Sequence, residues 1–392
     1  MGRYVKRFFQ RIVDAFLKGD KVLLLMCVVA TAFGGLMIAS STNGYDAGAL
    51  RYLVIHILAA AAGIFFYVLI SSADPEFFSE HRLVLVFINV GLLAMLYPFG
   101  VTVNGNRSWI SLPFLPFNIQ VAEICKITYI LIMASVMSSR KNKLSHPSSI
   151  VHMLFHFLLL FGMNVVISGD WGVSLIFFFI FVGMAYTGGV HMFWFGLAGL
   201  LALIVAPVLW FFILADYQKT RIMVLFDPSL DPLGIDAMYH TIRAQRSLTG
   251  GGLMGQGLFE GNRTQAGALF AQHTDYIFAA IGEEMGFVGC ALVLLMMVLI
   301  IGRCIWVGLR SQDLMRRLIC FGAASALIFQ VLVNVGMCIG VAPVIGITLP
   351  FISYGGSSII TLYAMLGLVS GVYSHPNPTS HERYIHPPIQ YQ

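Results

Sequence analysis

Ten stretches of apolar residues, each long enough to cross a bilayer as a helix, limit the fold of this chain more than any other feature. A membrane-crossing helix needs roughly 20 mostly apolar residues. The stretches cover residues 22–41, 53–71, 83–100, 118–137, 150–167, 173–189, 192–214, 277–302, 315–340 and 358–373. Only 10% of the 392 residues are charged, against roughly 25% in a soluble domain, so most of the surface must face lipid. We predict an all-α polytopic membrane protein, with residues 1–392 as one membrane domain.

The distribution of Lys and Arg predicts how the chain is oriented. Fifteen of the 23 basic residues fall on the side of the N-terminus, seven fall on the other side, and Lys126 lies inside a stretch. Because basic residues concentrate on the cytoplasmic side of a membrane, we expect the segments 1–21 and 374–392 in the cytoplasm. The basic residues form no stripe that indicates nucleic-acid binding. The six Cys residues have neither paired nor metal-ligand spacing.

One connection is much longer than the others. Residues 215–276 join the seventh and eighth stretches, and the orientation places them outside the cytoplasm. Such long loops are usually functional or disordered, and the mixture of short apolar pieces with Gly, Asp and Arg favours an ordered loop. Residues 237–248 are typical of a short helix, with Asp236 as its N-cap. The glycine-rich run from Gly250 to Gly257 indicates a close approach of the backbone to another surface.

Two ionisable residues occur inside the fourth apolar stretch, where charge is costly and therefore a sign of function. Glu123 and Lys126 are three residues apart, which places them on one face of a helix. They are either a structural ion pair or part of a polar cavity.

Two aspartates each precede a predicted helix on the outer side. Asp170 and Asp275 could act only as N-caps. Asp275, however, stands at the membrane interface, where partial burial raises the pKa of a carboxyl group and improves it as a base. Glu283 and Glu284 follow Asp275 at spacings of eight and nine, which predicts that at least one lies two turns deeper on a similar side of the helix. These patterns fit a transporter and an enzyme equally well.

Two motifs resemble those of one known family. His273 to Ala279 reads His-Thr-Asp-Tyr-Ile-Phe-Ala and is followed by Gly-Glu-Glu, and Leu349 to Ser358 reads Leu-Pro-Phe-Ile-Ser-Tyr-Gly-Gly-Ser-Ser. Both are similar to motifs of the SEDS family of RodA, FtsW and SpoVE-type proteins. The resemblance extends over nearly all ten stretches, and the 18-residue step from Gly257 to Asp275 is closer to the RodA type. The chain departs from the family pattern at residues 121–122, 270–271 and Ser108.

The resemblance implies a peptidoglycan glycosyltransferase that polymerises lipid II, inverting the sugar linkage as undecaprenyl pyrophosphate leaves. It implies Asp275 as the general base. The expected supporting polar residues are Gln120, Glu123, Lys126, Asp170, His273, Glu283 and Glu284. The expected contacts to the pyrophosphate and substrate are Arg107, Arg243, Arg246, Arg263, Ser353 and Ser357. A divalent cation, Mg²⁺ or Mn²⁺, could assist, and no organic cofactor is expected. A lipid II flippase and a non-catalytic scaffold remain the alternatives.

The resemblance also implies partners and a location. The expected location is the bacterial cytoplasmic membrane, in an assembly for elongation or division, with lipid II and the growing glycan strand as ligands. The expected protein partner is a class B penicillin-binding protein with one membrane span. Small residues on the eighth and ninth stretches would let that span pack closely: Gly289, Gly302, Ala323, Ala324 and Ala326.

Overall fold

The computed structural model describes residues 16–43, 49–74, 77, 81–103, 105–113, 115–231, 238–269 and 271–375. Ten helices in this part of the chain are long and apolar enough to cross a membrane. They are α2 (Lys21–Ser41), α3 (Ala49–Ser71), α5 (Arg82–Phe99), α6 (Val121–Ser138), α7 with the π-helical turn η2 (Pro147–Ser168), α8 (Trp171–Gly188), α9 with the π-helical turn η3 (Met192–Ile213), α13 (Ile277–Arg310), α14 (Leu314–Ile339) and α15 (Gly356–Ser374). The all-helical polytopic fold is confirmed.

Local sequence signals set the ends of several helices. Asp20 caps α2 by accepting a hydrogen bond from the backbone N–H of Leu23, and Asp313 caps α14 by accepting one from Arg316. Gly189, with φ +87°, ends α8, and the side chain of His191 caps α9. The expected boundary between the sixth and seventh spans, near residues 187–191, is therefore confirmed.

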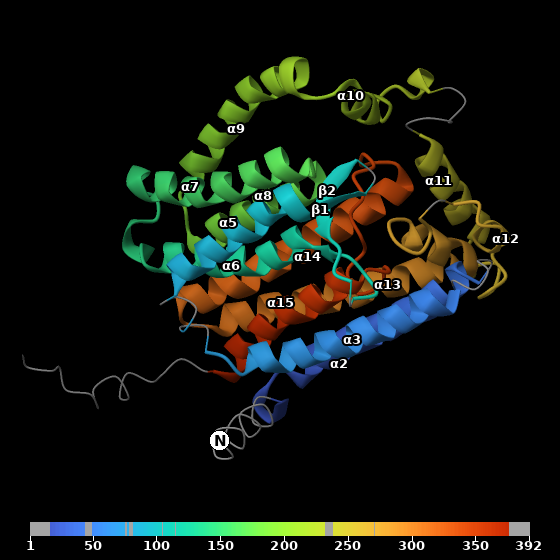
Figure 1. The fold of residues 1–392 in the computed structure, drawn as a ribbon, viewed down its shortest axis with the longest axis horizontal. Helices are drawn as coiled ribbons and strands as arrows, with labels where there is room; N and C mark the ends of the chain where they lie inside the picture. The colour runs from blue at the N-terminus through green and yellow to red at the C-terminus, as the bar shows by residue number, and fades with distance from the viewer. Residues whose placement is uncertain are drawn as a thin grey trace, which may run out of the picture.

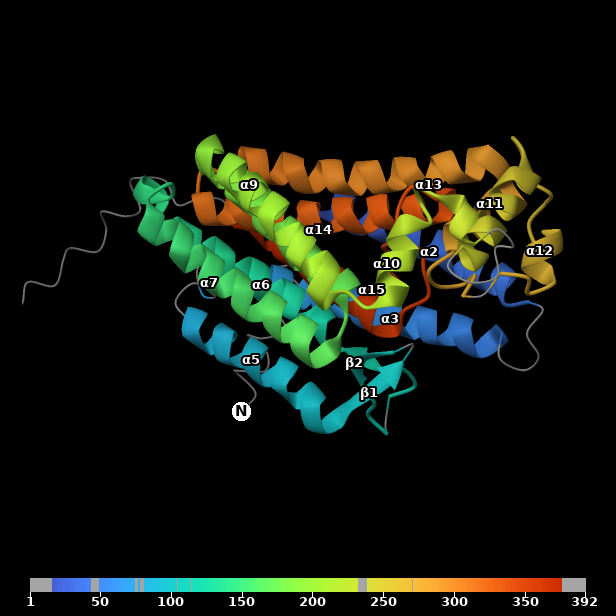
Figure 2. The ribbon, with the colours of Figure 1, turned by 90° about the horizontal axis from the view of Figure 1, so that it is seen from above.

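The helices form one bundle whose two ends differ (Figure 1). The end that carries the small β-sheet, α10 (Asp216–Met223), α11 (Tyr239–Gly251) and α12 (Asn262–Gln265) is called the loop end below. The opposite end, where Phe16 and His375 lie, is called the tail end. Helices α6, α14 and α15 are largely buried, whereas α9 has no buried residue and runs obliquely across the outside of the bundle (Figure 2).

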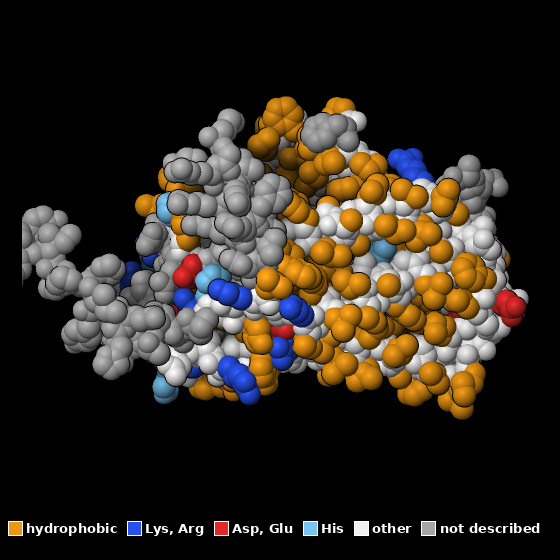
Figure 3. Space-filling model, turned by 90° about the horizontal axis from the view of Figure 1, so that it is seen from below, with side chains coloured by type: hydrophobic (Ala, Val, Ile, Leu, Met, Phe, Trp, Pro, Cys, Tyr) orange, Lys and Arg blue, Asp and Glu red, His pale blue; other side chains and the backbone are white. Residues whose placement is uncertain are grey.

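Apolar and charged side chains occupy different parts of the surface, as expected for a protein that crosses a membrane. Figure 3 shows apolar side chains over much of one face, with Lys and Arg gathered toward the tail end. Exposed apolar residues on α13 include Phe287, Leu295 and Val298. Most small residues expected to receive a partner helix are instead buried: Ala323, Ala324 and Ala326 are at most 1% exposed. Gly289 is also buried, and only Gly302 of the set is exposed.

A three-stranded antiparallel sheet, which the sequence did not predict, lies between α5 and α6. It consists of β1 (Gly100–Val103), β2 (Asn106–Ile110) and β3 (Ile119–Gln120), in the order β1-β2-β3. Trp109 pairs with Val101 on one side and with Gln120 on the other. The strands are too short to show a clear alternation of apolar and polar residues. Because β3 pairs with β2 and leads directly into α6, the sheet positions the start of α6 at the loop end.

The long loop is ordered where the structure describes it, with α10, the 3₁₀ turn η4 (Pro228–Leu230), α11 and α12. The predicted helix at 237–248 corresponds to α11, and its expected cap Asp236 lies outside the described residues. After α11, Gly252 and Leu253 accept hydrogen bonds from the backbone N–H groups of Phe287 and Val288. The N–H groups of Gln256 and Gly257 donate to Glu283 and Glu284 in return.

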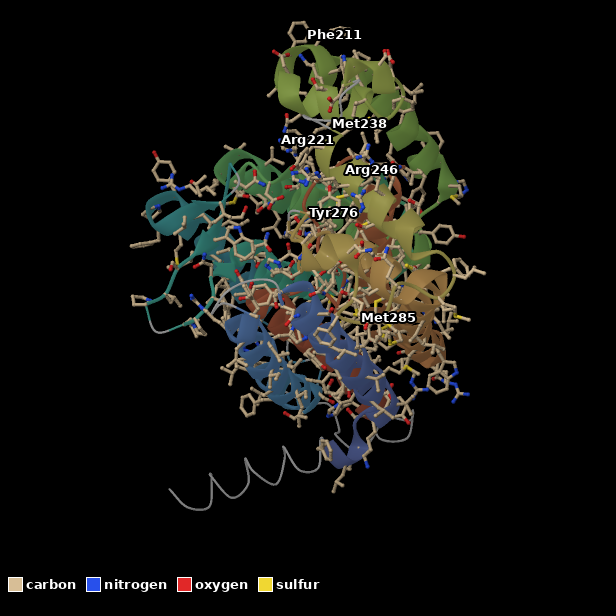
Figure 4. All side chains as sticks on the ribbon, turned by 90° about the vertical axis from the view of Figure 1, so that its right-hand side faces the viewer. Phe211, Arg221, Met238, Arg246, Tyr276 and Met285 are labelled. Atoms are coloured by element: carbon tan, nitrogen blue, oxygen red, sulfur yellow. The ribbon has the colours of Figure 1, made fainter. Side chains whose placement is uncertain are left out.

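These hydrogen bonds occur where α13 is broken. Gly286 has φ +65° and ψ −160°, a backbone conformation open essentially to glycine alone. It separates a buried first segment, residues 277–285, from the long span at 287–310. In the end-on view of Figure 4, Tyr276 and Met285 mark the two ends of the first segment and stand well apart, so this segment crosses the end of the bundle. The break leaves backbone groups of α13 without helical hydrogen bonds, and the glycine-rich run supplies their partners.

We predict that Gly286→Ala destabilises the fold. A Cβ atom at this position would lie 2.5 Å from the carbonyl oxygen of Leu253, and alanine is strained at this φ. The expected cost is about 1–3 kcal/mol, seen as a lower Tm of the purified protein in detergent. Gly302→Ala is the matched control, because a Cβ atom there meets nothing within 4 Å on the same helix. Equal Tm values for the two variants would show that the break is not strained.

Candidate functional site

A pocket of about 510 Å³ opens at the loop end of the bundle. Its wall combines the sheet, the first turns of α6, α8 and α15, one turn of α14, and the segment between α14 and α15. The polar residues around it are Arg51, Asn106, Asn118, Gln120, Glu123, Asp170, Thr274, Asp275, Gln330, Thr348, Tyr354, Ser357 and Ser358. Three carboxyl groups and one guanidinium group thus face a common space that is large enough for a sugar-sized ligand.

Asp275 lies in this pocket just before the buried first segment of α13. Tyr276, not Asp275, occupies the N-cap position, and no side chain caps this helix, so the alternative role of Asp275 as an N-cap is wrong. The side-chain amide of Asn334 donates to the backbone carbonyl of Asp275 at 2.9 Å and to that of Ile347 at 2.7 Å. The backbone is thereby held while the half-buried carboxylate faces the pocket.

Burial is the main cause of an altered acidity at Asp275, and the negative charge of Asp170 adds to it. Together they raise the pKa of the Asp275 carboxyl group to about 6. A carboxylate with this pKa is ionised at neutral pH and is a stronger base than an exposed aspartate.

Asp170 has both of the roles proposed for it. One carboxylate oxygen accepts the backbone N–H of Val173 at 3.0 Å and caps α8. The other accepts the Ser108 hydroxyl at 3.1 Å and the Gln120 amide at 3.4 Å. Burial raises the pKa of Asp170, while these hydrogen bonds act in the opposite direction. Gln120 and Asp170, as expected, line the pocket together.

Glu123 and Lys126 form the predicted ion pair on one face of α6. The Lys126 ammonium donates to Glu123 Oε1 at 2.8 Å, and the Thr361 hydroxyl donates to Glu123 Oε2 at 3.0 Å. Both charged residues are at most 3% exposed. Glu123 lines the pocket and Lys126 stands behind it, so the pair is structural and also contributes to the polar cavity.

Three further expected residues frame the pocket. Ser357 lines it, and its hydroxyl accepts the backbone N–H of Gln120 at 3.3 Å. Ser353 lies behind the wall, where its hydroxyl donates to the carbonyl of Thr274 at 2.6 Å. His273 also lies behind the wall, with its ring 4.7 Å from that of Tyr52, and burial lowers its pKa to about 4. His273 is therefore neutral at pH 7.

Glu283 and Glu284 do not line the pocket, which corrects the expectation that one of them would lie deeper beside Asp275. Glu283 accepts the backbone N–H groups of Arg263 and Thr264 at 2.8 and 3.0 Å. Glu284 accepts the Ser40 hydroxyl at 2.7 Å and the Gln265 amide at 2.9 Å. The reason is the direction of the segment that contains them: residues 277–285 lie before the break at Gly286 and cross the end of the bundle, so two turns along this segment lead no deeper into the membrane.

The four arginines expected to bind pyrophosphate are not among the pocket-lining residues. Arg107 donates to the carbonyl of Gly100 at 3.2 Å, and Arg243 lies 4.2 Å over the ring of Tyr239. On α12, the backbone N–H of Arg263 donates a hydrogen bond to the Glu283 carboxylate. Arg246 is exposed on α11, at the loop end in Figure 4. All four lie at the loop end, but Arg107 and Arg243 contact other groups there, and none of the four lines the pocket.

The sequence reasoning missed Arg51, the one Lys or Arg side chain among the described residues that lines the pocket. Arg51 lies in the first turn of α3, and it was counted only as a charge that sets orientation. Its position at the outer start of a span was the available signal. Gln330 and Asn334, four residues apart on α14, were missed as well, because amides inside an apolar stretch carry no charge to single them out.

No group of three or more His, Cys, Asp and Glu residues in the described part of the chain is placed to hold a metal ion. The oxygens of Asp170 and Glu123 already accept hydrogen bonds from protein donors. The side chains thus do not fit a dedicated metal cage. A role for Mg²⁺ or Mn²⁺ stays a prediction.

Comparison with known proteins gives a consistent result. The model of the FtsW/RodA/SpoVE family, described as cell cycle protein, matches residues 20–377. The chain is 32% identical over 358 residues to the peptidoglycan glycosyltransferase MrdB of Escherichia coli (strain K12), covering 91% of this chain and 94% of the relative. It is 30% identical over 363 residues to the probable peptidoglycan glycosyltransferase FtsW of Geobacter sp. (strain M18), covering 90% and 96%.

Solved structures match over almost the whole chain. One is a chain from a peptidoglycan synthase complex that coordinates polymerization and crosslinking, with a TM-score of 0.75, 27% identity, and coverage of 94% of this chain and 99% of that chain. Another is the rod shape determining protein RodA of Thermus thermophilus, with a TM-score of 0.66, 24% identity, and coverage of 92% and 98%. The second likeness supports the fold alone.

We predict that Glu123 and Lys126 are energetically coupled. Lys126→Met leaves the Glu123 carboxylate buried without its partner, at an expected cost of about 3–5 kcal/mol. The double variant Glu123→Gln/Lys126→Met should be more stable than Lys126→Met alone, because neither charge remains. The Tm values of the four proteins in this cycle test the coupling. Strictly additive changes would mean that the two side chains do not interact.

Proposed function

The chain belongs to the FtsW/RodA/SpoVE family of cell cycle proteins, and on this premise we propose that it polymerises lipid II into glycan strands. It is a peptidoglycan glycosyltransferase of bacterial cell-wall synthesis and a multi-pass protein of the inner membrane. The proposed mechanism rests on one observation. The carboxyl group of Asp275 lines a sugar-sized pocket, and its pKa is raised to about 6. Its relatives are named as glycosyltransferases, which favours this activity over a transporter or a scaffold.

The proposed reaction is a direct displacement. The Asp275 carboxylate takes the proton of the acceptor sugar hydroxyl, and the hydroxyl oxygen forms a bond to the anomeric carbon of the donor. The bond from that carbon to the pyrophosphate oxygen breaks, and undecaprenyl pyrophosphate leaves with the electron pair. Attack from the side opposite the leaving group converts an α-linked donor into a β-linked product. One base suffices for this inversion.

The departing pyrophosphate gathers negative charge, which a nearby cation can stabilise. We assign this task to Arg51, since it lines the same pocket as Asp275 whereas the four expected arginines do not. A guanidinium group binds phosphate oxygens through two parallel hydrogen bonds. Asp170, by contrast, keeps a negative charge near Asp275, which favours proton uptake by the base.

The proposed orientation places the loop end outside the cytoplasm. The tail end carries Arg140, Lys141 and Lys143 in a connection and Arg82 and Arg316 in the first turns of α5 and α14, in agreement with the concentration of basic residues on the cytoplasmic side. A pocket at the outer interface meets the water-soluble sugars of lipid II while its lipid tails remain in the bilayer. Labelling of single cysteines introduced at either end by a membrane-impermeant reagent tests this orientation.

We propose a class B penicillin-binding protein as the partner, within an elongation or division assembly. This chain makes glycan strands, and crosslinking requires a transpeptidase. A peptidoglycan synthase complex among the similar structures supports such a pairing. The accessible residues on α13, including Leu295, Val298 and Gly302, offer a surface for one membrane span. Co-purification from membranes with the transpeptidase expressed alongside is the measurement that decides this part.

We predict that Asp275→Asn lowers polymerisation of lipid II by purified protein about 10²-fold or more, because the amide is not a base. In the unchanged protein, the rate should fall as the pH drops below about 6, where Asp275 becomes protonated. Folding raises this pKa above its ordinary value of about 3.9, so ionisation of Asp275 lowers the free energy of unfolding as pH rises from about 4 to about 6. Asp275→Asn should therefore have an equal or higher Tm at pH 7.5. Near-normal polymer synthesis by the folded variant would remove Asp275 from this role.

Arg51→Gln should slow polymerisation about tenfold to a hundredfold, because it removes a cation from the charge that develops on pyrophosphate. Its Tm should stay near that of the unchanged protein, since Arg51 is exposed. Arg246→Gln is the matched control, as Arg246 is also exposed at the loop end but does not line the pocket. Equal activities of the two variants would contradict the assignment.

A further inference from the structure

Two neighbouring residues in the pocket wall link the places where its two aspartates stand. Ile345 and Gly346 line the pocket in the segment between α14 and α15 and are called the spacer below. The carbonyl of Ile345 packs on the first turn of α8, where a Cβ atom added to Gly172 would lie 2.7 Å from it and 3.5 Å from Asp170 Oδ1. A Cβ atom added to Gly346 would lie 3.6 Å from Asp275 Oδ2. The spacer therefore lies against the start of α8 beside Asp170 with one residue and against the Asp275 carboxylate with the next.

The backbone of the spacer is fixed by its own conformation and by its neighbours. Gly346 has φ +69°, a left-handed conformation that a residue with a side chain rarely adopts. The N–H of Ile345 donates a hydrogen bond to the sulfur of Met337 at 3.2 Å, and Ile347 after the spacer is buried. Because residue 346 is glycine, no Cβ atom stands between the spacer and the Asp275 carboxylate.

Two buried asparagines hold the backbones of the two aspartates. The Asn334 amide donates to the carbonyl of Asp275 at 2.9 Å and to that of Ile347 at 2.7 Å. The Asn164 amide donates to the carbonyl of Asp170 at 3.2 Å. Asn334 thus ties the spacer to the segment that carries Asp275, while Asn164 fixes Asp170 from the other side.

We infer that Asn334 is a positioning residue for glycosyl transfer, which acts with the spacer to fix where the Asp275 carboxylate stands relative to Asp170. The inference rests on the proposed function, because it concerns how the base of that reaction is placed. A base must reach the hydroxyl proton of the acceptor, and a displacement of about 1 Å can lower the rate about a hundredfold. Its distance from another negative charge and from water also decides how readily it takes up a proton.

Several titratable or charged groups surround Asp275, and they come from every element packed around it. They are Arg51 of α3, Glu123 of α6, Asp170 before α8, Cys338 of α14 and Tyr354 before α15, together with the adjacent His273 and Tyr276. Glu123 is compensated by Lys126, and among these groups Asp170 is the one whose negative charge raises the pKa of Asp275. The separation that the spacer sets is therefore the one that acts on the base.

Gly346→Ala tests the spacer. Its methyl group would stand beside the Asp275 carboxylate and exclude water from it, so the carboxyl group should lose its proton at a higher pH. We expect kcat to fall about tenfold or more, and the decline of kcat/KM on the acid side to move about half a pH unit or more toward higher pH.

Gly189→Ala is the matched control. Gly189 has φ +87°, is exposed at the tail end of α8, and a Cβ atom there meets nothing within 4 Å. Alanine is strained at a positive φ in both variants, so both should lower the Tm. Only Gly346→Ala should change the pH profile.

Asn334→Leu tests the tie between the spacer and the base. Leucine is similar in size but donates no hydrogen bond, so the segment that carries Asp275 is no longer held. We expect kcat to fall about tenfold to a hundredfold. A carboxylate that can move toward water and away from Asp170 takes up a proton less readily. The acid side of the profile should therefore move about half a pH unit or more toward lower pH, opposite to Gly346→Ala.

Two measurements decide the outcome. The first is the pH profile of kcat/KM for polymerisation of lipid II by the purified full chain, which follows ionisation of the free enzyme. The second needs no substrate, because a water-soluble carbodiimide reacts with protonated carboxyl groups and mass spectrometry follows the labelling of Asp275 against pH.

The inference is overturned if either measurement gives the same midpoint for Gly346→Ala, Asn334→Leu and the control. If the unchanged protein does not polymerise lipid II, but the labelling midpoints move in the two expected directions, the proposed function fails and the placement of the carboxylate by Asn334 and the spacer stands.

Discussion

Polar groups inside a membrane protein must find their partners within the protein, because hydrocarbon offers none. This constraint explains most of the contacts around the pocket. Glu123 is compensated by Lys126 and Thr361, and Asp170 by a helix N-terminus and two side chains. The backbone groups released where α13 breaks at Gly286 are satisfied by the glycine-rich run. Once these pairings are made, the half-buried carboxylate of Asp275 remains at the pocket.

The same constraint explains which parts of the fold could be predicted from the sequence. The ten spans follow from apolar length alone, and the Glu123–Lys126 pair follows from spacing on one helix face. Asp275 could be singled out from its motif and interfacial position. These features are local, so a short piece of sequence contains all the information that they need.

The errors occur where distant segments meet. The break at Gly286 depends on backbone contacts with residues 252–257, so residues 277–302 were interpreted as one helix and Glu283 and Glu284 were placed wrongly. The arginines of the pocket were predicted to be Arg107, between the third and fourth stretches, and three from the long loop, whereas folding brings Arg51 of α3 to the wall. The small sheet depends on pairing between Trp109 and Gln120, and strands this short carry too little sequence pattern to predict that pairing.

The pairing of the glycine-rich run with the broken helix also limits how the length of this chain can change over evolution. Residues 252, 253, 256 and 257 bond through their backbones to residues 287, 288, 283 and 284, while the side chains of Glu283 and Glu284 hold Thr264 and Gln265. One inserted or deleted residue within 252–265 would shift this register and leave backbone groups unpaired at the edge of the bilayer. We therefore expect changes of length to fall outside residues 252–265, where no such register has to be kept.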